Sequence, residues 1–176
     1  MIRRILTVLA LALTLTAPSL NASAQDQLAK PKALLTLSFI RYLGWDDAAR
    51  QGDFVIGVVR DRELSQWLTN QSQGKKFGFQ DVVVKQFKSV DEVTDCQVIY
   101  VSKNISFARN AAKILDKVGK NTLVMTEEEG ATNNGSMINF VVRDGRLRFE
   151  LSKSNAQMGN IQFGQKLTDM TAAINL

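Results

Sequence analysis

Two hydrophobic patterns alternate along the chain from about residue 28 to residue 126. A continuous apolar run of strand length lies at Phe54–Val59, and further strand candidates lie at Val82–Phe87, Val98–Val101 and Thr122–Thr126. Such runs are typical of strands that are buried on both faces, as in parallel sheets. Segments with helical character lie between them, at Arg62–Asn70, near Val90 and at Phe107–Val118. This alternation predicts an α/β fold with a mostly parallel sheet.

The first helical segment, Leu28–Trp45, is apolar on nearly every face. Its main polar interruptions are three basic residues, Lys30, Lys32 and Arg41. A helix with so little polar surface is mostly buried. Gly44 is the residue at which we expect this helix to stop.

The pattern changes after Gly130, where apolar and polar residues alternate on both sides of Asp144-Gly145. This dipeptide between two alternating runs predicts a hairpin with a type I′ turn. One face of the hairpin is then apolar. The other carries Asn139, Arg143, Arg146, Arg148 and Glu150, which we interpret most simply as a solvated face. A final helix is predicted from about Asn155 to Ile174. The fold class is therefore a single-domain, mostly parallel α/β sheet flanked by helices, with a C-terminal antiparallel β-hairpin and a final helix.

Residues 1–24 have the three parts of a secretory signal peptide. Met1–Arg4 is a short basic region, Ile5–Leu15 is an apolar run interrupted only by Thr, and Ala22-Ser23-Ala24 is a small-residue cleavage signal. The apolar run is too short to span a bilayer, which takes about 20 residues. We therefore predict export, with cleavage after Ala24. Residues 25–176 then form a domain of about 150 residues, enough for one core.

Composition excludes several classes of function. The chain has 22 Lys+Arg, 17 Asp+Glu and no His. The near balance of charge argues against a nucleic-acid partner, which would require clustered cations. Without His the chain lacks the commonest general base and metal ligand. We therefore predict that the protein is not an enzyme and has no cofactor and no metal.

Few side chains suggest chemistry. Ser72-Gln73-Gly74-Lys75 fits a Ser-x-x-Lys pattern, but the accompanying motifs of that enzyme class are missing. Glu127, Glu128 and Glu129 could bind a hard cation, although a solvated turn or helix start is the simpler interpretation. Trp45 and Trp67 are either interface anchors or half-buried core residues.

The single cysteine, Cys96, is an unpaired thiol at the start of an apolar run. No intrachain disulfide can form. A small buried hydrophobe is the favoured interpretation, and an intermolecular disulfide or a redox-reactive thiol is the alternative.

Five segments carry a resemblance to a known family. They are Phe39–Trp45, Phe54–Val58, Cys96–Val101, Gly135–Phe140 and Arg146–Leu151. Through them the chain resembles the YfiR-like periplasmic proteins over nearly all of its predicted mature length. It departs from the family pattern at Asp46, at Asn134 and at Leu151-Ser152. Redox-responsive members contain cysteine pairs, of which only the position of Cys96 is present here.

The resemblance implies a periplasmic repressor of an inner-membrane diguanylate cyclase, or of a similar sensor protein, acting on cyclic-di-GMP synthesis, biofilm formation and motility. It also implies sequestration by an outer-membrane lipoprotein, and it leaves a homodimer open. A single-lobe periplasmic small-molecule-binding protein that feeds a membrane sensor or transporter is the alternative, and an enzyme is the least favoured. For the regulator we predict a partner interface at Arg143, Arg146 and Arg148, with Trp45 as an apolar anchor, because three close cations are best tolerated beside an acidic partner.

Overall fold

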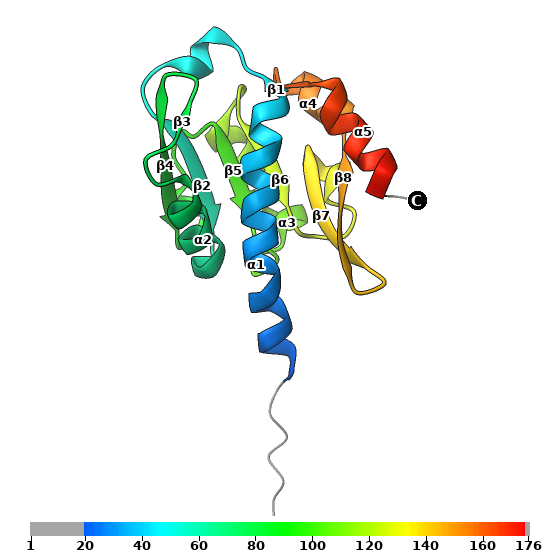
Figure 1. The fold of residues 1–176 in the computed structure, drawn as a ribbon. Coiled ribbons are helices and arrows are strands. Elements are labelled where there is room, and N and C mark those ends of the chain that lie inside the picture. The colour runs from blue at the N-terminus through cyan, green and yellow to red at the C-terminus, as the bar shows by residue number, and fades with distance from the viewer. Residues whose placement is uncertain (1–19, 175–176) are drawn as a thin grey trace, which may run out of the picture.

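A computed structural model describes the chain from Leu20 to Ile174 (Figure 1). The helices are α1 (Leu20–Phe39), α2 (Arg62–Ser72), α3 (Phe107–Val118), α4 (Lys153–Met158) and α5 (Gln165–Ile174). The short 3-10 helices are η1 (Ile40–Tyr42), η2 (Asp47–Arg50), η3 (Val90–Glu92) and η4 (Ala131–Asn134). The strands are β1 (Leu43–Gly44), β2 (Phe54–Val59), β3 (Lys76–Phe77), β4 (Gln80–Phe87), β5 (Val98–Val101), β6 (Leu123–Thr126), β7 (Ile138–Arg143), β8 (Arg146–Leu151) and β9 (Gln162–Phe163).

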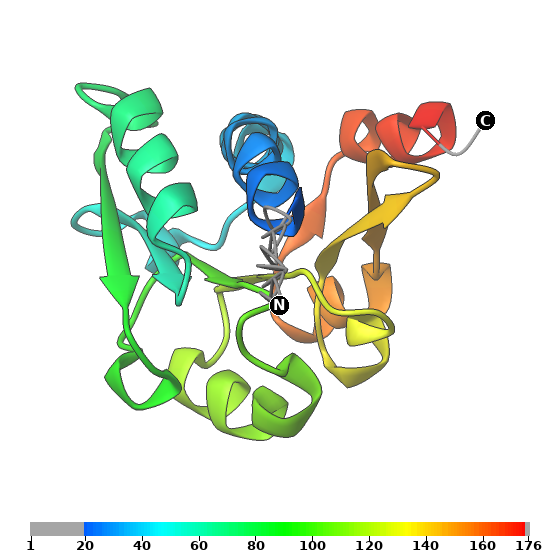
Figure 2. The same cartoon turned by 90° about the horizontal axis from the view of Figure 1, so that it is seen from below.

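The predicted fold class is confirmed. Seven strands form one sheet in the order β3-β4-β2-β5-β6-β7-β8, and the five central strands are parallel. Strand β3 at one edge and β8 at the other are antiparallel to their neighbours. The sheet is curled. Figure 2 shows α1 lying inside the curl, with α2 and α5 to either side of it and α3 on the outer face.

The core is built by the apolar strand runs that the sequence indicates. Strands β5 and β6 are buried at every position, and in β2 only Val55 is half-exposed. Helix α1 closes the concave side through Phe39, whose ring packs 4.6 Å from that of Phe149 and 6.0 Å from that of Phe140, measured between centroids. The same helix therefore fastens the parallel sheet to the C-terminal hairpin.

The β7–β8 hairpin has the predicted register. Phe140 pairs with Phe149 and Arg143 with Arg146. Asp144 and Gly145 have φ values of 51° and 70°, as a type I′ turn requires at both central positions. Its second face is not uniformly solvated, however, because Asn139 is fully buried.

Two predicted helix boundaries are wrong. The first α-helix ends at Phe39, and Gly44 belongs to β1, which pairs with β9. The predicted final helix, Asn155–Ile174, is two helices, α4 and α5, with β9 between them. Asn160 has a φ of 60°, the left-handed conformation that commonly ends a helix, and this interrupts the apolar stripe that suggested one helix.

The predicted signal peptide falls mainly outside the described residues, which begin at Leu20. Cleavage after Ala24 therefore stays a prediction, and it would shorten α1 so that the helix starts at Gln25. Among the helices that the structure describes, none is both long and apolar enough to span a membrane.

Candidate functional site

The carboxyl ends of β2, β5 and β6 lie side by side at one edge of the sheet. The connection from β2 to β4 passes through α2 on the side of α1, whereas that from β5 to β6 passes through α3 on the opposite side (Figure 2). Strands β2 and β5 are therefore neighbours whose connections leave in opposite directions. This is the topological switch point, outside which open α/β sheets bind their ligands. We take this edge as the candidate site.

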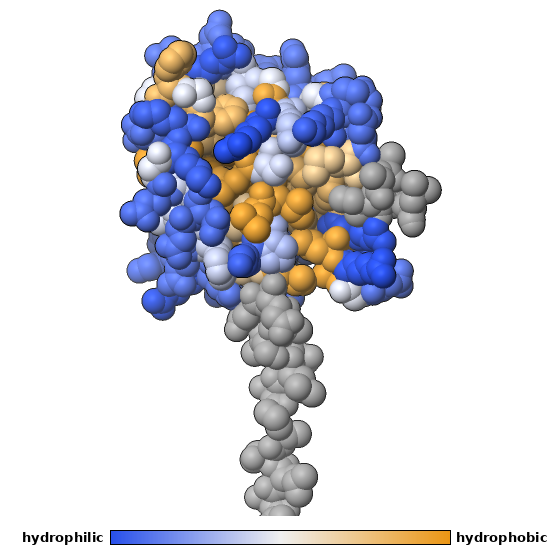
Figure 3. All heavy atoms as spheres, in the orientation of Figure 1, coloured by the Kyte–Doolittle hydropathy of each residue, from blue (hydrophilic) through white to orange (hydrophobic). Residues whose placement is uncertain are grey.

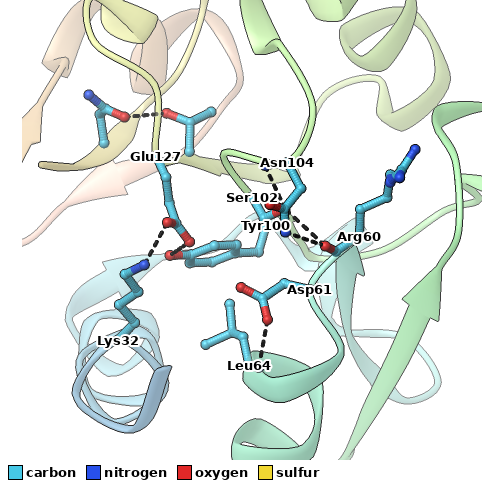
Figure 4. A network of polar contacts seen from close by, with 10 residues as sticks. Lys32, Arg60, Asp61, Leu64, Tyr100, Ser102, Asn104 and Glu127 are labelled. Atoms are coloured by element: carbon cyan, nitrogen blue, oxygen red, sulfur yellow. Dashed lines mark hydrogen bonds and ion pairs between the residues drawn. The ribbon is translucent and has the colours of Figure 1, made fainter. Parts of the chain in front are cut away.

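Glu127 is the centre of a buried polar cluster at this edge. It follows β6 directly, and its carboxylate accepts a hydrogen bond of 2.8 Å from the Tyr100 hydroxyl. Its other oxygen lies 2.5 Å from the Lys32 ammonium, in an ion pair whose side chains are 7% and 5% exposed. Figure 4 shows the three side chains converging from α1, β5 and the end of β6. Burial and the Glu127 carboxylate raise the pKa of Tyr100 well above its usual value, so the phenol stays a hydrogen-bond donor.

Asp61 approaches the same cluster from the end of β2 (Figure 4). Its carboxylate caps α2 by accepting a hydrogen bond of 2.9 Å from the backbone N–H of Leu64. Burial raises the pKa of Asp61, and the negative charge of Glu127 adds to the shift, against the hydrogen bond from Leu64. The switch point thus carries two carboxylates and one ammonium, with Lys32 and Glu127 buried and Asp61 half-buried.

The loops after β2 and β5 are tied to each other across the switch point. The carbonyl oxygen of Arg60 accepts hydrogen bonds from Asn104 Nδ2 at 2.9 Å and from the Ser102 hydroxyl at 3.2 Å (Figure 4). Arg60 itself has a φ of 56°, a left-handed conformation that is uncommon for a non-glycine residue. The crevice between the two strands is therefore closed by the chain's own hydrogen bonds.

Glu128 occupies the amino end of α3. Its carboxylate accepts hydrogen bonds from the backbone N–H groups of Phe107 and Ala108 and from the Ser106 hydroxyl. Helix amino ends at a switch point are the usual places for phosphate groups. Here α2 is capped by Asp61 and α3 by Glu128, so both places already hold a carboxylate. A phosphate would meet like charge at either one.

The third consecutive glutamate, Glu129, turns to the hairpin. Both its oxygens bind the Arg143 guanidinium, at 2.6 and 2.7 Å. Arg143 also contacts Glu150 at 3.4 Å, and Glu150 accepts from the buried Asn139 amide at 2.9 Å. This ion pairing lowers the pKa of Glu129 and raises that of Arg143.

The three glutamates therefore bind three different elements. The interpretation as a solvated turn or helix start is wrong for Glu127, whose side chain is buried, whereas Glu129 is exposed in a turn and Glu128 lies at the start of α3. Glu127 holds α1 and β5, Glu128 holds α3, and Glu129 holds β7. Their carboxylates point apart. No group of metal-ligating side chains occurs among the residues that the structure describes.

The predicted interface residues lie in two separate places. Arg143 is engaged by Glu129 and Glu150, whereas the structure gives Arg146 and Arg148 no acidic partner among the described residues. Trp45 is 7% exposed and packs edge-on against Phe54, at the β1 end of the molecule. The arginines are at the hairpin, so the structure does not bring Trp45 together with them.

Cys96 and Ser72 are both buried. The Cys96 thiol is free and 6% exposed, and burial raises its pKa to about 12. Ser72 is 3% exposed, and its hydroxyl donates to the Thr69 carbonyl oxygen at 3.4 Å. Neither side chain is placed to act as a nucleophile on a solute.

A hollow of about 230 Å³ lies next to the buried cluster, between the middle of α1 and the β7–β8 hairpin. We call it the hairpin groove. Apolar and charged side chains both line it: Leu28, Lys32, Lys103, Glu127, Glu129, Phe140, Val141, Val142, Arg143 and Leu147. Figure 3 shows apolar residues gathered over α1 and toward the hairpin, with hydrophilic residues around them.

The family resemblance is confirmed by a family model described as YfiR/HmsC-like, which matches residues 29–171. The chain belongs to the YfiR/HmsC-like family. YfiR/HmsC-like proteins are periplasmic and regulatory rather than catalytic. A comparison with curated proteins finds no match.

The match places the cluster, and all of the groove lining except Leu28, inside the YfiR/HmsC-like domain, since Lys32, Tyr100, Glu127 and Val142 all lie in the matched range. Sequence reasoning missed the cluster. A signal was present, because a lysine within an apolar helix and a glutamate directly after a buried strand are charges that need partners when buried. Their separation of 95 residues hid the pairing.

Proposed function

We propose that this chain is a periplasmic regulator that binds the periplasmic sensor region of an inner-membrane diguanylate cyclase and represses cyclic-di-GMP synthesis. Membership of the YfiR/HmsC-like family is the observation that carries the proposal. An outer-membrane lipoprotein that sequesters the repressor is part of the same proposal.

The geometry of the switch point supports a binding role over catalysis. The side chains that could do chemistry there are engaged in structural contacts. Glu127 binds Lys32 and Tyr100, and Glu128 binds the amino end of α3. The buried network makes a rigid domain. Such a domain shifts a two-state receptor if it binds one state more tightly, and an affinity ratio of about 100 is worth roughly 2.7 kcal/mol.

The same geometry makes the small-molecule alternative less favourable for phosphorylated ligands. Carboxylates of Asp61 and Glu128 cap the two helices that would otherwise receive a phosphate. A protein partner does not require these positions, because it can use the outer surface of α1 and the hairpin.

The proposal is tested in cells by deleting the gene and measuring cyclic-di-GMP. We expect the level to rise in the deletion strain and to return when residues 25–176 are exported to the periplasm behind a heterologous signal peptide. The same residues produced without a signal peptide are the control and should not restore the level. If the parent strain is shown to contain the protein and its deletion leaves the cyclic-di-GMP level unchanged, repression of a cyclase is contradicted.

A further inference from the structure

We infer that the hairpin groove is the docking surface for the regulated protein, and that it receives an apolar side chain flanked by acidic residues. The inference rests on the proposed function, whose interface it names. Three observations carry it: an uncovered apolar surface, a lysine of the lining without an acidic partner, and a floor held by ion pairs and hydrogen bonds.

The apolar surface is the part of the hairpin that α1 does not cover. At the base of the hairpin the apolar face is sealed, since Phe140 and Phe149 are each 2% exposed beneath Phe39. Toward the turn, α1 no longer covers the apolar face of the hairpin. Val142 is 52% exposed, and its cross-strand partner Leu147 is half-buried.

Helix α1 extends the same surface. Leu28 is half-buried in the wall of the groove, and Leu34 on the outer side of the helix is 45% exposed. Large apolar side chains that are exposed next to each other mark interaction sites more often than scattered ones do. Figure 3 shows this apolar area as a continuous region on the face that presents α1.

The charges around the groove define the partner. Lys32 is neutralised by Glu127 and Arg143 by Glu129, so both acidic residues of the lining are already paired. Lys103 of the lining has no acidic partner among the described residues. Arg146 and Arg148 also have none, but they lie on the opposite face of the hairpin from Val142 and Leu147 and do not line the groove. The rim thus keeps one unpaired cation, Lys103, beside an apolar centre, and the lining has a net positive charge. This is complementary to an acidic segment with an apolar anchor.

The floor of the groove is pre-formed. Lys32 and Glu127 belong to the buried cluster, and Arg143 is held by two hydrogen bonds from its guanidinium to Glu129. A rigid pocket loses little conformational freedom when a partner binds, so its apolar contacts contribute more fully to affinity. This reasoning predicts that the few exposed apolar residues, rather than the network, change affinity when they are substituted.

The experiment compares two matched double variants of residues 25–176. One carries Val142→Glu and Lys103→Glu in the groove. The other carries Met158→Glu and Lys153→Glu on α4, where Met158 is 67% exposed and Lys153 is exposed. Helix α4 lies at the opposite end of the molecule from the hairpin turn (Figure 1). Both variants replace one exposed apolar side chain and one cation with glutamates.

Binding is measured by calorimetry against the purified periplasmic region of each membrane diguanylate cyclase that the host encodes. We expect the groove variant to bind at least about 30-fold more weakly than the wild type, as for a hot spot combined with a charge reversal, and the α4 variant within about twofold. The two single variants separate the electrostatic contribution to binding from the apolar one. Lys103→Glu should act mainly at low salt, and Val142→Glu at every salt concentration.

The outcomes distinguish a failure of the proposed function from a failure of the proposed docking surface. If the wild type binds none of these regions, the proposed function fails and the docking surface fails with it. If the wild type binds and the groove variant binds equally well, only the docking surface is overturned. If Val142→Glu weakens binding but Lys103→Glu does not at low salt, the acidic character of the partner is overturned.

A second measurement tests the docking surface even if the groove double variant fails to fold. A benzophenone amino acid replaces Val142 or, as control, Met158, and the cells are irradiated. We expect a covalent adduct with the cyclase from position 142 and none from position 158. Adducts from 158 alone, in cells where cyclic-di-GMP is still repressed, would place the interface elsewhere.

Discussion

Glu127→Gln should destabilise the fold far more than Glu129→Gln, although the two residues are neighbours in sequence. Glutamine keeps the size of Glu127 and an oxygen that accepts from Tyr100. It removes the charge that compensates Lys32, whose side chain is 7% exposed. Breaking one partner of a buried ion pair costs about 3–5 kcal/mol. That is a large part of the roughly 5–15 kcal/mol by which domains are stable.

Glu129→Gln is the matched control, because it removes a carboxylate from an ion pair whose side chains are 47% and 71% exposed. Exposed pairs contribute little to stability. The assay is urea unfolding of residues 25–176 at pH 7, followed by circular dichroism. Lys32→Met combined with Glu127→Gln should recover part of the loss, because it removes the uncompensated ammonium. Equal stability of Glu127→Gln and Glu129→Gln would refute the claim that the Lys32–Glu127 pair fastens α1 to the sheet.

Three further predictions concern single groups. Tyr100→Phe removes the hydroxyl that donates to Glu127 and should cost about 1–3 kcal/mol in the same urea assay, because it leaves a buried acceptor less satisfied; an unchanged midpoint would contradict it. Burial raises the pKa of Asp61 above its ordinary value of 3.8, so its protonation favours the folded state. That stabilisation is complete below pH 3.8 and is lost as the pH rises through the folded pKa. Asp61→Asn keeps the helix cap and should abolish this loss in urea midpoints between pH 3 and 7, whereas a variant that shows the wild-type profile would exclude Asp61 as its source. Finally, a pKa of about 12 implies that the Cys96 thiol reacts with a disulfide reagent at pH 8 roughly a thousandfold more slowly in the folded protein than in urea, and comparable rates would show that the thiol is accessible.

The parts of the fold that are encoded locally could be predicted. The apolar runs at Val98–Val101 and Leu123–Thr126 indicate buried parallel strands, and Asp144-Gly145 fixes the hairpin register without any tertiary information. The division of the last helix is also local, since Asn160 and the nearby glycines are helix-terminating residues. The apolar stripe through Ile161 and Leu167 concealed it, because both residues are buried as a single helix would also require.

The candidate site could not be predicted, because its contacts depend on strand order. Lys32 meets Glu127 only when α1 lies across the carboxyl ends of β5 and β6, and no local pattern specifies that crossing. The same holds for Glu128, which caps a helix that begins 21 residues earlier in the chain. Isolated charges in apolar surroundings identify the residues that need partners, whereas the folded chain decides which partner each one finds.

The most direct test of the account uses the cyclase itself. The full-length enzyme is reconstituted in lipid nanodiscs, which leave its periplasmic side accessible, and the initial rate of cyclic-di-GMP formation from GTP is measured as residues 25–176 are added. The account predicts a saturable fall in rate that the α4 double variant reproduces and that the groove double variant reproduces only at much higher concentration. A rate that stays constant at saturating protein, for every membrane diguanylate cyclase of the host with a periplasmic region, would contradict it.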